Sequence, residues 1–95
     1  MYEVFSMRAV ITVVGKDSVG ILAKVSAKCA ESNVNINEVT QSVLEDMFCM
    51  IMLCDISKMT KAFGDFSDEM QKLGTEMGMS VHVMHETIFN SMHRI

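Results

Sequence analysis

A strand that ends in a glycine-bounded turn is the feature that most constrains the fold of this chain. Residues 10–14 (VITVV) form a β-branched apolar run that stops at Gly15, and a second glycine follows at Gly20. An amphipathic helix is predicted from Ser18 to about Ser32. The first-turn N–H groups of a helix have no intrahelical partner and favour anions. The pattern therefore predicts a β–α turn that presents backbone N–H groups to a small carboxylate or phosphate.

Two further strands are predicted over residues 33–43 and 47–54. A hairpin turn at residues 45–46 joins them. Ile36 is out of phase with Val39, which predicts a bulge between these two positions. Residues 47–54 are apolar at every position, a pattern typical of a strand that is covered on both faces.

A second helix is predicted to begin at Ser57 or Thr60 and to end at Gly78. Its apolar residues recur at steps of 4, 3, 4, 3 and 4: Met59, Phe63, Phe66, Met70, Leu73 and Met77. A fourth strand is predicted over residues 79–84, and the spacing of apolar residues in 86–93 indicates a short terminal helix.

The resulting order, β-α-β-β-α-β, predicts an α+β fold of the ferredoxin-like type. Four strands form an antiparallel sheet, both helices lie on one face, and a short C-terminal helix follows. The other sheet face is then open, although residues 47–54 have no polar side. Either the terminal helix or a second subunit must cover it, and we expect a homodimer. Residues 1–6 are predicted to be an N-terminal extension, and 7–95 a single domain.

Composition excludes several classes of partner. The formal net charge is −4, and the eight Lys and Arg residues form no run, which disfavours nucleic acid. No apolar stretch approaches the roughly 20 residues that cross a bilayer, and a secretory leader is not expected, since the N-terminus lacks its basic, apolar and small-residue pattern. The sequence therefore predicts a cytoplasmic protein without a membrane partner.

Neither the cysteines nor the histidines form a metal-ligand pattern. Cys29, Cys49 and Cys54 have no ligand-pair spacing and are expected to be buried, reduced thiols. His82 and His85 are three apart at the end of a strand and do not share a face. We therefore expect no metal site and no cofactor.

Residues 13–21 (VVGKDSVGI) and 33–36 (NVNI) resemble the ACT domain, and the resemblance covers nearly all of residues 7–95. It is strongest to a group of small stand-alone bacterial and archaeal ACT proteins. The resemblance implies that small effectors, most often amino acids, bind between two domains paired side by side. The positions it implies are Gly15, Lys16, Asp17, Ser18, Val19, Gly20, Ile21, Leu22, Asn33, Asn35 and Ile36.

The residue chemistry agrees with such a site. N–H groups of residues 18–22 are suited to an α-carboxylate, and Asp17 or an asparagine side chain to an α-ammonium. At Gly20 a ligand can approach where a Cβ would collide. A purely structural interpretation stays open, in which both glycines serve only the turn and packing, Asp17 only caps the helix, and the asparagines only satisfy backbone.

The sequence shows no Ser/His/Asp or Cys/His nucleophile arrangement, so catalysis is not expected. We predict a regulatory module that binds a small molecule, an amino acid or similar metabolite, as a homodimer. The alternative is an interaction and dimerisation module without a small ligand, which docks on another protein through its sheet or its terminal helix.

Overall fold

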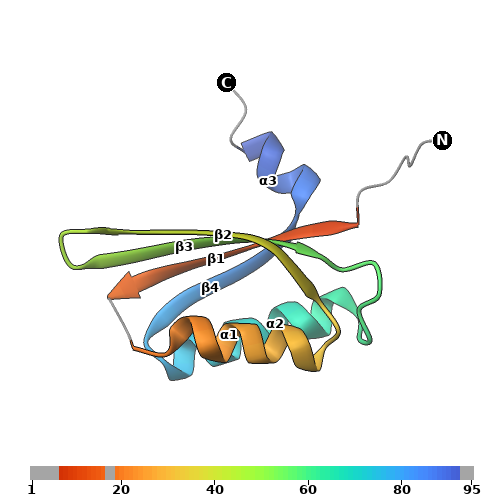
Figure 1. Ribbon diagram of the computed structural model, residues 1–95, viewed down its shortest axis with the longest axis horizontal. Coiled ribbons are helices and arrows are strands. Elements are labelled where there is room, and N and C mark those ends of the chain that lie inside the picture. Colours follow the sequence, from red (N-terminus) through yellow and green to blue (C-terminus); the bar gives the residue numbers. More distant parts are fainter. Residues whose placement is uncertain (1–6, 17–18, 93–95) are drawn as a thin grey trace.

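The chain folds into one antiparallel sheet with the strand order β2-β3-β1-β4, and two helices cover one of its faces (Figure 1). The computed structural model describes residues 7–16 and 19–92. The expected extension at residues 1–6 and the candidate site residues Asp17 and Ser18 lie outside this part. The elements are β1 (Arg8–Lys16), α1 (Ile21–Glu31), β2 (Asn35–Leu44), β3 (Met47–Asp55), α2 (Phe63–Glu76), β4 (Met79–His85) and α3 (Glu86–Met92). The predicted α+β architecture with a short C-terminal helix is confirmed.

Strand β1 is longer than predicted, because it continues through Gly15 to Lys16. Gly15 pairs with Phe48 on one side and Met79 on the other. A Cβ built on Gly15 would lie 2.5 Å from the Met79 sulfur. The absence of a side chain at Gly15 therefore leaves room for the Met79 side chain of β4.

Helix α2 begins later than predicted, at Phe63. Two hydrogen bonds hold the preceding segment as a loop. The Ser57 N–H donates to the Asp55 carboxylate at 2.8 Å, and the Thr60 N–H donates to the Ser32 carbonyl at 3.0 Å. An aspartate that bonds the backbone two residues ahead favours a turn over a helix. The apolar stripe continues across this loop, since Met59 packs against the core without being helical.

The core lies between the helices and the inner sheet face. Alternate β3 residues point inward and are buried: Phe48, Met50, Met52 and Cys54. The predicted bulge in β2 is confirmed by a register shift between Ile36 and Glu38. It returns Val39 to the same face as Ile36, as the cross-strand partners Met52 and Cys54 require.

The outer sheet face, opposite α1 and α2, stays largely open within one chain. Val14, Met47 and Ile51 on this face are 41%, 41% and 43% exposed. Helix α3 lies on this side and packs mainly against β1 and β4 (Figure 1). An ion pair fastens it there, with Arg8 Nε donating to Glu86 Oε1 at 3.0 Å. β3 is thus covered on one face only, and the terminal helix does not cover the other.

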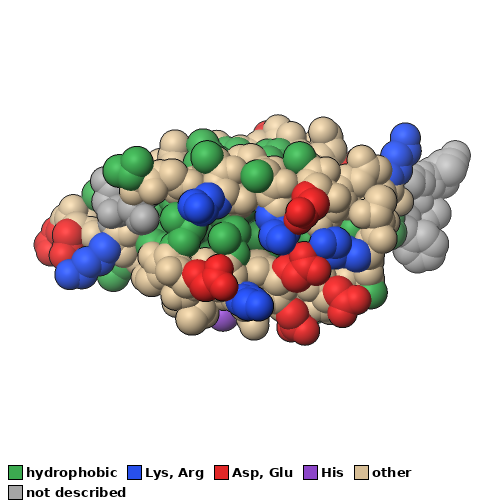
Figure 2. Space-filling model, turned by 90° about the horizontal axis from the view of Figure 1, so that it is seen from below, with side chains coloured by type: hydrophobic (Ala, Val, Ile, Leu, Met, Phe, Trp, Pro, Cys, Tyr) green, Lys and Arg blue, Asp and Glu red, His purple; other side chains and the backbone are tan. Residues whose placement is uncertain are grey.

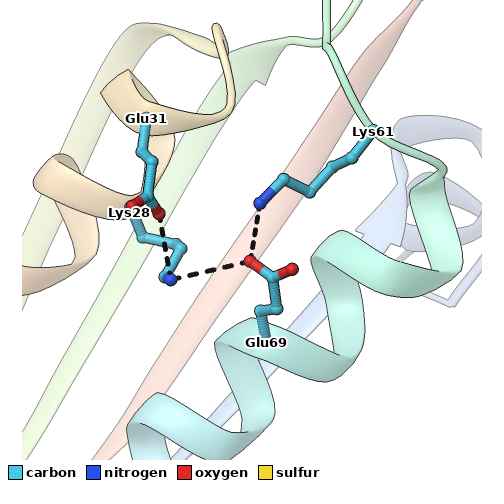
Figure 3. Close-up of polar contacts among 4 residues, drawn as sticks. All are labelled: Lys28, Glu31, Lys61 and Glu69. Atoms are coloured by element: carbon cyan, nitrogen blue, oxygen red, sulfur yellow. Dashed lines mark hydrogen bonds and ion pairs between the residues drawn. The ribbon is translucent and has the colours of Figure 1, made fainter.

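Charged side chains of both signs surround an apolar strip on the helix side of the molecule (Figure 2). Glu69 of α2 lies between two lysines and joins α1 to the loop that precedes α2 (Figure 3). Its Oε1 is 2.7 Å from Lys61 Nζ and 3.5 Å from Lys28 Nζ. The bond to Lys61 is the main cause that lowers the pKa of Glu69. The bond to Glu31 is the main cause that raises the pKa of Lys28. The ion pairs of Glu69 with Lys28 and Lys61 thus link α2 to α1 and to the loop before α2 at the surface.

Helix α2 approaches β4 closely at Gly74, which is buried. A Cβ at this position would lie 2.5 Å from Val81 Cγ2 and 2.9 Å from the Met79 carbonyl oxygen. Carbon atoms ordinarily stay 3.5–4.0 Å apart. Only glycine permits this spacing between the helix and the strand.

Candidate functional site

The glycine turn leads into α1 through a left-handed residue. Gly20 is the N-cap of α1, with φ 89°, and it carries no side-chain cap. The first intrahelical bond runs from the Lys24 N–H to the Gly20 carbonyl at 3.0 Å. The N–H groups of Ile21 and Leu22 precede that bond, as the first N–H groups of a helix do. The helix begins at Ile21, later than the predicted start at Ser18.

The side chains of this turn face in different directions. Val19 is fully exposed and Leu22 is 37% exposed, whereas Ile21 is buried in the core. A Cβ on Gly20 would meet nothing within 4 Å, so this glycine serves the left-handed backbone and leaves open space beside it. Because the Ile21 side chain is buried, a ligand at this turn could contact only the backbone of Ile21.

The second candidate segment, residues 33–36, begins at the other end of α1 (Figure 1). Asn33 has φ 59°, and this asparagine makes the left-handed exit from α1. Its side-chain amide donates to the Lys58 carbonyl at 2.8 Å. This bond ties the α1–β2 turn to the β3–α2 loop. Ile36 is half-buried and packs against the core.

A cavity of about 470 Å³ opens between this turn and this loop. Its lining residues are Ala30, Asn33, Val34, Asn35, Asp55, Ser57 and Lys58. Asn35 and Asp55 are directly paired across β2 and β3, so their side chains leave the sheet on the same side. The cavity therefore combines an amide, a carboxylate, a hydroxyl and an ammonium group with a small apolar wall.

The carboxylate of Asp55 is ionised at neutral pH. Hydrogen bonds from the Ser57 N–H and the Ser57 hydroxyl are the main causes that lower its pKa. The positive charges of Lys58 and Arg8 lower it further. Arg8 itself is engaged with Glu86. Within the described part of the chain, Lys58 makes no ion pair, and it contributes an uncommitted cation to the rim.

The structure thus separates the candidate residues into two groups. Gly15 and Lys16 end β1 and residues 19–22 lead into α1, while Asn33, Asn35 and Ile36 lie beyond the end of α1. The part of α1 after Leu22, residues 23–31, separates them along the helix axis at about 1.5 Å per residue. One chain alone does not bring the two groups together.

Sequence reasoning missed Asp55 and Lys58. A signal was available in the hairpin. Counting the β2–β3 register back from the turn at residues 45–46, with one extra residue for the bulge, places Asn35 opposite Asp55.

The three thiols and the His85 ring have structural surroundings in the described part of the chain. Cys29 and Cys54 are fully buried, and Cys49 is half-buried on the outer sheet face. A hydrogen bond with Cys29, and then burial, raise the pKa of the Cys54 thiol well above its ordinary range, which keeps it protonated. The ring of His85 stacks on Phe63, with centroids 4.2 Å apart. Among residues 7–16 and 19–92, no cluster of His, Cys, Asp and Glu is arranged to hold a metal ion.

Comparison with known proteins decides the family. The model of the ACT domain matches residues 7–84. This chain belongs to the ACT domain family. A UPF0237 protein of Listeria innocua is 48% identical over 89 residues, which cover 94% of this chain and all of the relative. An ACT domain protein from Streptococcus pneumoniae has a similar structure, with a TM-score of 0.77, 35% identity, and coverage of 90% of this chain and 96% of the other.

The ACT fold recurs as a part of larger proteins. The regulatory subunit of aspartate kinase from Thermus thermophilus matches 83% of this chain over 51% of its own length, with 20% identity and a TM-score of 0.61. ACT domains are regulatory modules that bind small ligands, and this membership favours a module without catalysis of its own. None of the described helices has the length and hydropathy needed to traverse a lipid bilayer.

Proposed function

We propose that this ACT domain is a regulatory module that binds an amino acid or a similar small metabolite and acts as a homodimer without catalysing a reaction. The observation that carries the proposal is the cavity of about 470 Å³ beside Asn33 and Asn35. Its volume lies within the range of ordinary small-molecule sites, about 300–1,000 Å³. Its charged and amide groups are suited to binding a small polar molecule.

The second copy is proposed from the outer sheet face. Exposed apolar side chains on β1 and β3 lie next to half-buried Cys49 and Leu53. An exposed apolar face of a sheet is costly in water and marks an interaction surface. Two copies that share this face would bury it, and a closed pair is the commonest assembly of identical chains.

A metabolite-panel melting experiment tests the proposal. We expect one amino acid or a small related set to raise the Tm, because a ligand that binds only the folded state stabilises it. The variants Asn35→Ala and Asp17→Ala should reduce the shift, whereas Asn90→Ala on α3 should leave it unchanged. A broad panel without any shift would count against small-molecule binding.

A second candidate function, protein docking without a small ligand, is favoured by the same exposed outer sheet face. A pull-down with this chain as bait separates the two. Recovery of the same partner with and without metabolites supports docking, and partner recovery that depends on one amino acid supports regulation.

A further inference from the structure

The cavity at the end of α1 carries both signs of charge within one chain. Asp55 lies at the end of β3 and Lys58 in the loop that follows, and both line the cavity. The two side chains do not form an ion pair with each other in the described structure. Each charge is therefore available to a ligand group of the opposite sign.

The geometry around the two charges is fixed by the fold. The Ser57 N–H bond at 2.8 Å orients the Asp55 carboxylate, and the strand pairing places the Asn35 amide beside it. The Asn33 amide holds the Lys58 backbone at 2.8 Å, so the start of the Lys58 side chain is anchored as well. Groups held in place before a ligand arrives lose less entropy on binding.

Arg8, the other cation near Asp55 at this end of the sheet, is already engaged in an ion pair. Arg8 faces Asp55 across the β1–β3 pairing, but its guanidinium is engaged with Glu86. Lys58 is then the cation that remains for a carboxylate ligand. Ala30 and Val34 add an apolar wall of the cavity, which suits an aliphatic part of a ligand.

We infer that this cavity binds an α-amino acid as its zwitterion within a single chain, with Asp55 binding the ammonium group and Lys58 the carboxylate. This inference rests on the proposed function and adds the two residues that bind the charged groups, both of them outside the glycine turn. A neutral metabolite, a simple amine or a simple carboxylic acid would leave at least one of the two charges without a partner.

The test uses the whole chain labelled with ¹⁵N and each of the twenty standard L-amino acids in turn. We expect binding of at least one of them to shift the amide signals of Asn33, Asn35 and residues 55–58. The variants Asp55→Asn and Lys58→Gln should each weaken binding about 10- to 100-fold, the value of a hydrogen bond to a charged group. The asparagine still accepts the Ser57 N–H bond, and Lys58 bonds Asn33 only through its backbone, so both variants should fold.

Two kinds of control sharpen the assignment. Asp68→Asn and Lys72→Gln make the same charge changes at exposed positions of α2 and should bind as the wild type does. Two analogues of the bound amino acid, one without its amino group and one without its carboxyl group, should bind weakly. Asp55→Asn should not weaken the first analogue further, and Lys58→Gln should not weaken the second, because each change removes a contact that the analogue already lacks.

Three results would overturn the inference. If signal shifts and affinity losses fall on residues 16–22 while the cavity variants bind normally, the inference is wrong and the proposed function stands. If either analogue binds as tightly as the amino acid, the zwitterion is not what is recognised. If no amino acid binds at all, both the inference and the proposed amino-acid function fail.

Discussion

The close approach of α2 to β4 allows a quantitative test of the fold at Gly74. In Gly74→Ala the new methyl carbon would start 2.5 Å from Val81 Cγ2, about 1 Å closer than carbon atoms pack. The neighbours cannot move aside easily, because one is a stiff β-branched side chain and the other is the Met79 carbonyl oxygen. The helix would have to shift away from the sheet.

Two opposing terms set the magnitude of this change. Overpacking in a well-filled core costs about 1–3 kcal/mol. Replacing a glycine inside a helix by alanine stabilises the helix by about 1 kcal/mol, because alanine has the higher helix propensity. Because the new methyl group would clash with backbone as well as with a side chain, we expect an overpacking cost in the upper part of this range. The free energy of unfolding should then fall by about 1–2 kcal/mol. For a domain of this size each kcal/mol corresponds to about 4–8 °C in Tm.

Gly64 provides a matched control in the same helix. A Cβ there would meet nothing within 4 Å, so Gly64→Ala changes only the freedom of the unfolded chain and should stabilise the protein by about 0.4–1 kcal/mol. Urea denaturation followed by circular dichroism measures both variants. If Gly74→Ala is as stable as the wild type or more stable, α2 does not lie this close to β4, and the packing described above is wrong.

Three further predictions concern the turn, the assembly and the response to pH. Gly20→Ala should lower the free energy of unfolding by about 1–2 kcal/mol, because φ 89° is strained for a residue with a Cβ; an unchanged urea midpoint would contradict this. Ile51→Lys, in the outer sheet face, should give monomers in sedimentation equilibrium where the wild type gives dimers, with exposed Gln71→Lys as control; a wild type that is already monomeric would refute the assembly. The pKa of Glu69 is lowered in the folded state, so its stabilising contribution is present above its usual value of 4.5 and is lost on acidification through the lower folded-state pKa. Glu69→Gln should flatten that acid loss in urea titrations, and an equally steep loss would assign it to other carboxylates.

Local patterns were sufficient for the order of the elements. The apolar stripe from Phe63 to Met77 identified α2, and the phase change at Ile36 identified the bulge. Each of these signals depends only on residues that are close to one another in the sequence. The start of α2 was misplaced, because the apolar spacing continues through Met59 while hydrogen bonds from Ser57 and Thr60 hold that segment as a loop.

The cavity depends on contacts between distant residues. Asn33 meets the backbone of Lys58, and Asn35 meets Asp55, only after the β2–β3 hairpin has formed with its register shift. The glycine turn was identified as a turn, but its first glycine lies inside β1 and accommodates Met79. Whether its backbone N–H groups bind an anion stays a prediction.

Helix α3 has a consequence for the way copies of this chain can stack. It stands on the outer sheet face at one end, held there by Arg8 and Glu86, while the exposed apolar residues continue along β1 and β3. A second copy that packs on the outer sheet face and is shifted toward this end would clash with α3. Only a limited range of offsets is then open, which favours a closed pair over the continuous sheet-on-sheet layering that builds fibres.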